Sequence, residues 1–187
     1  GVGKMNMRSR SAANFSHEDL QNITDICRQH GVKSYLTVNT IVYNDELDEV
    51  KSLLDLAKQC NVSAIIASDF SVLTYCQQIG LEIHISTQCN ITNIEAVRFY
   101  AQFADVVVLA REVNLAQAAA IAQQIEDENI CGPRGEKIRL EMFVHGALCM
   151  AVSGKCYLSL DNLNYSANRG ACLQPCRRNR AASAWPR

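Results

Sequence analysis

Four cysteines near the end of the chain are the residues whose type and spacing most directly indicate chemistry. Cys149, Cys156, Cys172 and Cys176 follow the pattern C-x6-C-x15-C-x3-C within a stretch rich in Gly, Ser and Asn. Four thiolates are the ligand count of a structural zinc site or of an iron–sulfur cluster. A thiolate could instead be a nucleophile, although one sulfur cannot both ligate a cluster and attack a substrate.

The spacing of these cysteines favours an iron–sulfur cluster, with zinc as the alternative. Zinc ribbons and fingers usually carry two short pairs of ligands, whereas only Cys172 and Cys176 are close in this chain. The other cysteines are expected to be small buried apolar residues, because free cysteine is among the most buried residue types. They are Cys27, Cys60, Cys76, Cys89 and Cys131.

Two polar residues lie just before the cysteines: Glu141 within the apolar run at 138–144 and His145 directly after it. If this run is a strand, Glu141, Phe143 and His145 share one of its faces. His145 could bind a carboxylate or move protons near neutral pH, or it could simply cap a loop. A buried Glu141 needs a partner, for which an arginine at another strand end is the natural candidate.

Arg111 is the strongest candidate for binding an anionic substrate. It follows the apolar run at 105–109, and its neighbour Glu112 points the other way. A guanidinium can hold a dicarboxylate through paired hydrogen bonds. Arg8, Arg10 and Arg169 are further candidates, and each could equally be a solvated surface arginine.

Short apolar runs alternate along the chain with segments that have the periodicity of amphipathic helices. The pattern predicts strands at 33–38, 62–67, 81–85, 105–109 and 138–144, and helices at 17–30, 45–60, 69–79, 92–103 and 114–128. Such alternation indicates parallel βαβ units. An open doubly wound sheet would be expected to show a G-x-G-x-x-G motif, which is missing.

Polar residues directly after each predicted strand favour a TIM-like (β/α)8 barrel, whose functional residues lie at the carboxyl ends of its strands. Because only five βα steps are visible, we expect a barrel fragment without its first strand and its closing elements. The predicted division is a partial barrel at 1–148, a cysteine-rich metal or cluster segment at 149–178 and an unpatterned tail at 179–187.

Composition narrows the classes of protein further. The formal net charge of −1 gives no global basic footprint for nucleic acid, although the end of the chain gathers arginines without acids. That basic run could touch RNA phosphates or be an ordinary tail; it comprises Arg169, Arg177, Arg178, Arg180 and Arg187. No apolar window is long enough for a membrane span. The odd number of cysteines favours a reducing cytosol over a disulfide framework.

The segment EMFVHGALCMAVSGKCYLS, at 141–159, resembles the signature of the peptidase U-32 family, the collagenase-like proteases. All fixed positions of that signature match. The segments NRGACLQPCR at 168–177 and MRSRSAANF at 7–15 also resemble the family. The sequence lacks G-x-S-x-G and H-E-x-x-H, so it carries no serine-hydrolase or zinc-protease motif.

The resemblance implies several activities. The family is named for degrading collagen and peptides, yet several members resemble proteins that use prephenate to hydroxylate the wobble uridine of tRNA, and a quinone-hydroxylating branch binds a 4Fe-4S cluster. We therefore expect an iron–sulfur protein of the tRNA-hydroxylation type, with the four cysteines as ligands and His145, Glu141 and Arg111 as catalytic residues. The alternatives are a peptidase acting on peptides and a non-catalytic scaffold with a structural metal. A protein partner of the same family is a further expectation.

Overall fold

Five parallel strands form the centre of the molecule. The computed structural model describes residues 1–10, 14–146 and 149–177. The strands are β1 (Tyr35–Val38), β2 (Ala64–Ala67), β3 (Ile83–Ile85), β4 (Val106–Val108) and β5 (Arg139–Glu141), and they pair in the order in which they occur along the chain. Because crossovers between parallel strands are right-handed, this order places the connecting helices on one face of the sheet.

The connecting helices match the predicted segments to within a few residues. They are α1 (His17–Gln29), α2 (Leu47–Gln59), α3 (Phe70–Ile79), α4 (Ile94–Tyr100) and α5 (Leu115–Asp127). Helix α1 begins with a reciprocal capping box between Ser16 and Asp19, and α3 ends at Gly80 in the left-handed conformation. The apolar periodicity and the end signals were therefore sufficient to locate the helices.

The core lies between the sheet and these helices. Alternate strand residues such as Leu36, Ile65 and Ile85 are fully buried, and they belong to the same cluster as Leu54 of α2 and Leu73 of α3. The intervening strand residues face the other side of the sheet. This second face carries the polar groups described below.

The eight-stranded barrel is not confirmed. The described residues form an open sheet of five strands in sequential order, which is the arrangement found in the wall of a barrel. The last predicted strand was too long: it spans Arg139–Glu141 rather than 138–144, because β4, the strand beside it, ends at Val108. His145 therefore lies in a loop, and the two-residue alternation from Glu141 to His145 does not hold.

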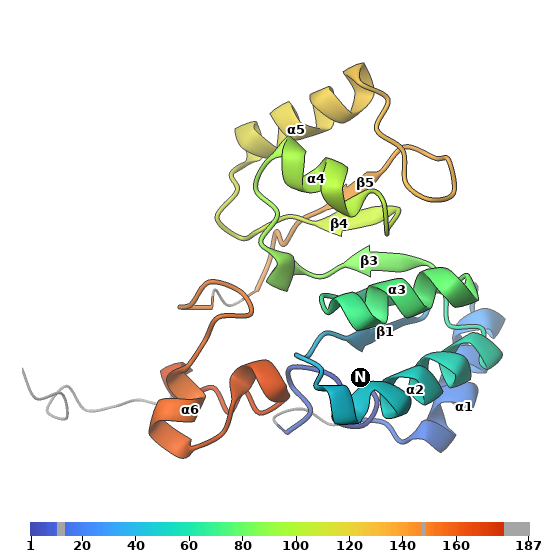
Figure 1. Cartoon of the computed structure of the whole chain (residues 1–187), viewed down its shortest axis with the longest axis vertical. Coiled ribbons are helices and arrows are strands. Elements are labelled where there is room, and N and C mark those ends of the chain that lie inside the picture. Colours follow the sequence, from blue (N-terminus) through green and yellow to red (C-terminus); the bar gives the residue numbers. More distant parts are fainter. Residues whose placement is uncertain (11–13, 147–148, 178–187) are drawn as a thin grey trace, which may run out of the picture.

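The cysteine-rich segment packs against the beginning of the chain and against the segment between β1 and α2. It contains α6 (Leu158–Leu163), and Figure 1 shows α6 on the side of the N-terminus, away from α4 and α5. Backbone hydrogen bonds link Arg10 N to Gly170 O and Ile41 N to Asn168 O, both at 3.1 Å. The predicted tail at 179–187 lies outside the described residues. No helix in the described ranges has the length and apolar character needed to cross a membrane.

Candidate functional site

A cavity of about 770 Å³ lies at the carboxyl ends of the strands and is called here the larger cavity. Thr37 and Ile66 of the sheet form part of its floor, and loops after β1, β3, β4 and β5 form its walls. Its wall residues include Asn39, Ser86, Gln88, Arg111, His145, Cys149 and Cys172. The position of the cavity follows from parallel topology, which brings the ends of all strands to one edge.

Arg111 is a charged group of the larger cavity that is held in place by hydrogen bonds. Its Nη2 atom donates to the backbone oxygen of Ala151 at 2.8 Å and to Oγ of Ser153 at 2.7 Å. Its Nε atom is buried and has no acceptor among the described residues. Since buried N–H groups normally have partners, this donor marks a place where a ligand oxygen would be stabilised.

Cys149 shares the larger cavity with Arg111. Burial would raise the pKa of its thiol, but the backbone N–H of Ala151 and the guanidinium of Arg111 stabilise the thiolate, so the pKa lies below the ordinary value. A more acidic thiol is a better metal ligand and a more available nucleophile at neutral pH. Cys149 is also exposed to solvent, as either role requires.

His145 also lines the larger cavity, and its exposed side chain makes no hydrogen bond with the described residues. It follows the end of β5 by four positions and precedes Gly146, whose φ of 130° only glycine adopts easily. Its imidazole is therefore available to a bound substrate. Its predicted role in proton transfer stays a prediction.

Glu141 does not line the larger cavity, although the sequence placed it beside His145. Its carboxylate instead approaches His84 of β3, with 3.8 Å between Glu141 Oε2 and His84 Nδ1. The expected arginine partner is therefore absent from this contact. His84 also lies 3.3 Å from Glu82, and the ring is 4 % exposed. The sequence signal for His84 was its place, with Glu82, as one of two polar residues that alternate with apolar ones at 81–85.

The cysteines are only partly brought together. Cys149 and Cys172 line the larger cavity, whereas Cys156 and Cys176 do not. Within the described ranges, no three His, Cys, Asp or Glu side chains are close enough to hold a metal ion. The four thiols as placed thus do not fit a cluster or a zinc ion, and the predicted ligand set stays a prediction. Of the five cysteines expected in the core, Cys60 and Cys76 are buried; Cys27, Cys89 and Cys131 are partly exposed.

Arg169 anchors the cysteine-rich segment to the residues directly before α2. Its guanidinium bonds both carboxylate oxygens of Glu46, with 2.8 Å from Nη2 to Oε1, and it lies 3.9 Å above the ring of Tyr43. The hydrogen bonds from Arg169 are the main reason that the pKa of Glu46 falls to about 2. Arg169 is therefore a structural residue, and its predicted role in binding RNA or a carboxylate is not supported by its contacts.

The fold and the cavity define a parallel α/β protein with a polar site at the carboxyl ends of its strands. Residues 1–182 match peptidase family U32, and the chain belongs to this family. It is 59 % identical over 178 residues to a collagenase of Porphyromonas gingivalis, covering 95 % of this chain and 43 % of that protein. A tRNA hydroxylation protein P1 of Bacillus subtilis is 32 % identical over 170 residues, covering 89 % of this chain and 38 % of that protein.

A solved structure supports the fold. The chain is similar to the U32 peptidase Mk0906 with a TM-score of 0.54 and 14 % identity, covering 75 % of this chain and 57 % of that one. The chain thus spans less than half the length of the two curated relatives named above. The family named from the signature at 141–159 is confirmed. The collagenase name is carried by a nearer relative than the tRNA hydroxylation name.

Proposed function

We propose that the larger cavity is the reaction site of a collagenase-like U32 protein that cleaves peptide bonds. This reverses the order expected from the sequence, which placed RNA hydroxylation first. The observation that carries the proposal is the buried Nε of Arg111, which has no acceptor in the described chain although it lies beside an acidic thiol. The collagenase relative at 59 % identity supports the same choice.

In this proposal the three cavity residues have separate roles. Arg111 donates hydrogen bonds to the carbonyl oxygen of the scissile peptide, where negative charge develops. The Cys149 thiolate attacks the carbonyl carbon and forms an acyl–enzyme. His145 gives a proton to the departing amine, and water then hydrolyses the thioester and restores the thiol. Because this role requires a free Cys149, it excludes that residue as a cluster ligand.

Cleavage of gelatin and of synthetic peptides by the purified full-length protein tests this function. Replacing Cys149→Ser should reduce the rate by about a hundredfold or more, because a hydroxyl is a far weaker nucleophile than a thiolate at neutral pH. Cys60→Ser is the matched control, since Cys60 is buried away from the larger cavity. Equal rates in the wild type and Cys149→Ser would reject the mechanism.

A second candidate is prephenate-dependent hydroxylation of the wobble uridine of tRNA. Arg111 favours it as well, because a guanidinium with a vacant N–H can hold a carboxylate co-substrate. In that case Cys149, Cys156, Cys172 and Cys176 are the candidate ligands of a 4Fe-4S cluster or zinc, and His145 and Glu141 would exchange protons. The relative named tRNA hydroxylation protein P1 supports this candidate. Mass spectrometry of tRNA from a deletion strain tests it, and unchanged wobble-uridine hydroxylation rejects it.

The third candidate is a non-catalytic scaffold with a structural metal, working with a protein partner of the same family. The expected setting of all three candidates is a reducing cytosol, because nine cysteines, an odd number, do not suit a disulfide framework. A scaffold predicts that cysteine substitutions impair folding while neither peptide cleavage nor RNA modification depends on the larger cavity. Loss of either activity in a folded Arg111→Lys variant would exclude it.

A further inference from the structure

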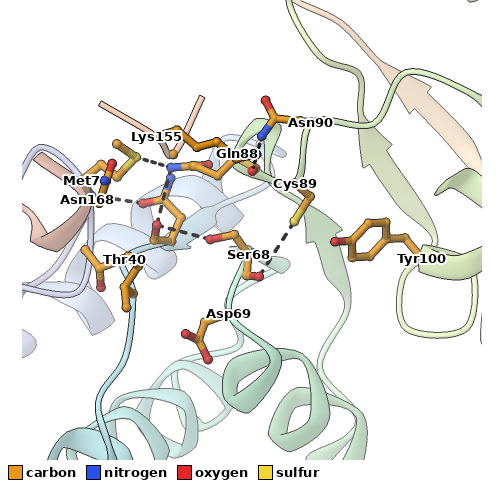
Figure 2. A pocket seen from close by; sticks show the side chains of 13 residues that line it. Met7, Thr40, Ser68, Asp69, Gln88, Cys89, Asn90, Tyr100, Lys155 and Asn168 are labelled. Atoms are coloured by element: carbon orange, nitrogen blue, oxygen red, sulfur yellow. Dashed lines mark hydrogen bonds between the residues drawn. The ribbon is translucent and has the colours of Figure 1, made fainter. Parts of the chain in front are cut away.

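A second cavity of about 300 Å³, called here the smaller cavity, adjoins the larger one. The loops after β1, β2 and β3 supply most of its wall, and the remainder comes from the cysteine-rich segment, Met7 and Tyr100 of α4. Figure 2 shows its labelled side chains, with Tyr100 at one end and Met7 and Asn168 at the other. Four residues line both cavities: Met7, Asn39, Gln88 and Gly154. None of the roles proposed above uses the smaller cavity.

Two amide oxygens in its wall lack hydrogen-bond donors. Asn168 is 7 % exposed, and its Oδ1 atom has no partner within the described residues. The amide of Asn90 is oriented by two bonds from its Nδ2, to Gln88 O at 2.7 Å and to Ser153 O at 3.0 Å. Its Oδ1 is then left buried without a donor. Because unmade hydrogen bonds of buried groups cost stability, the Asn168 oxygen indicates a ligand that donates, whereas the Asn90 oxygen points away from the other labelled side chains (Figure 2).

The hydroxyl groups of the wall are also available as acceptors. Ser68 gives its proton to Asn39 O at 3.3 Å, and Thr40 points its hydroxyl at the sulfur of Met5 at 3.9 Å. Both oxygens keep lone pairs for a ligand. Lys155 is the complementary group, since its ammonium is exposed and makes no bond with the described chain. The wall thus offers several acceptors and one strong donor.

The charges of the wall balance. Asp69 and Lys155 carry opposite charges, and burial raises the pKa of both the Cys89 thiol and the Tyr100 phenol, so that these two remain neutral. A carboxylate ligand could not donate to the Asn168 amide oxygen, and an ammonium ligand could not accept from Lys155. Hydroxyl groups do both. Their partners come from separate loops, so a ligand needs several hydroxyls to reach them.

We propose that the smaller cavity binds an uncharged polyol of monosaccharide size, either a free sugar or the ribose of a nucleoside. Asn168 accepts a hydrogen bond from one of its hydroxyls, and Lys155 donates to another. This site stands independently of the proposed peptide cleavage, because it uses neither Arg111 nor Cys149.

Ligand-observed NMR and calorimetry on the intact protein test the proposal. The probes are D-ribose and uridine, with propylammonium, propionate and acetamide as controls. Ribose should bind, and the control compounds should neither bind nor displace it. Uridine binding more tightly than ribose would identify a nucleoside as the source, whereas equal binding would identify a free sugar.

Asn168→Leu separates this role from a structural one. The change removes an acceptor that bonds to nothing in the described chain, so the melting temperature should hold or rise, while ribose affinity should fall by about tenfold. Asn22→Leu on the exposed surface of α1 is the matched control and should leave ribose binding unchanged. If Asn168→Leu fails to fold, Lys155→Met replaces it as the test. Lys155 is exposed, so this variant should fold, and its ribose affinity should be lower than that of the wild type.

Three results would overturn the proposal. They are absence of ribose binding at its solubility limit, binding of ribose that neither Asn168→Leu nor Lys155→Met weakens, and binding of a control compound in place of ribose. Each of them can occur with peptide cleavage intact. Failure of this site is therefore distinguishable from failure of the proposed function.

Discussion

Replacing Glu46→Gln should weaken the attachment of the cysteine-rich segment to the rest of the protein and lower its stability. Glu46 is 7 % exposed, and Arg169 bonds both of its carboxylate oxygens across 123 positions of sequence. Fully buried ion pairs cost about 3–5 kcal/mol when one partner is removed, and exposed pairs about 0–1 kcal/mol. The side chain of Arg169 is 28 % exposed, so we expect an intermediate loss of about 2 kcal/mol.

Thermal and urea unfolding measure this loss. A change of about 2 kcal/mol corresponds to a melting temperature lower by about 6 °C for a chain of this size. Glu49→Gln is the matched control, because Glu49 bonds Lys4 at 2.8 Å on the exposed surface and should change stability by less than about 0.5 kcal/mol. Combining Glu46→Gln with Arg169→Met should cost less than the sum of the two single changes.

The same pair predicts a pH dependence. Hydrogen bonds from Arg169 lower the pKa of Glu46 from 4.5 to about 2, so the carboxylate stabilises the folded state fully above pH 4.5. As the pH falls from 4.5 through about 2, the carboxylate is protonated and its contribution is lost. The stability difference between wild type and Glu46→Gln should therefore shrink over this interval. If the stability difference between wild type and Glu46→Gln is the same at pH 7 and pH 2, or is zero at both, the ion pair of Glu46 with Arg169 does not stabilise the fold in this way.

Three further changes have defined outcomes. Arg111→Lys keeps the charge but loses the fork of donors, so kcat/KM for peptide cleavage should fall by about a hundredfold in steady-state assays. Gly170→Ala should destabilise the protein by about 2 kcal/mol in urea unfolding, because Gly170 has a φ of 87° and the added carbon would lie 2.5 Å from Ser9 Oγ. Gly31→Ala is the control for backbone strain alone: Gly31 has a φ of 64° and open space around it, so this change should cost about 1 kcal/mol. If Cys149, Cys156, Cys172 and Cys176 ligate a cluster, metal analysis after anaerobic iron loading should show that Cys156→Ser loses iron and that the control Cys60→Ser keeps it. Equal iron content in both variants would reject this ligand set.

The sheet and its helices were predictable because their signals are local. Apolar runs at 33–38 and 62–67 become β1 and β2, and Ser16 with Asp19 begins α1 as its capping motif predicts. The position of the larger cavity was also predictable, since parallel strands place their carboxyl ends together. Arg111, which follows β4, meets His145 and Cys149, which both follow β5, in the larger cavity.

The remaining features depend on contacts between distant parts of the chain, which periodicity does not record. The bond from Ser9 Oγ to Gly170 O spans 161 positions, and Arg169 finds Glu46 rather than a substrate. The strand after α5 ends at Glu141 because its neighbour β4 ends at Val108, and this shortening separates Glu141 from His145. The sequence thus indicated which polar residues could act, but not which residues they contact.

In the proposed mechanism, Arg111 holds the reacting oxygen of a peptide substrate in the larger cavity. A crystal structure of the full-length protein, with Cys149→Ser and a bound peptide, tests it most directly. We expect the scissile carbonyl oxygen within about 3 Å of the Arg111 Nε atom, with position 149 beside the carbonyl carbon. A peptide bound away from the larger cavity, with Arg111 Nε still lacking a ligand acceptor, would contradict it.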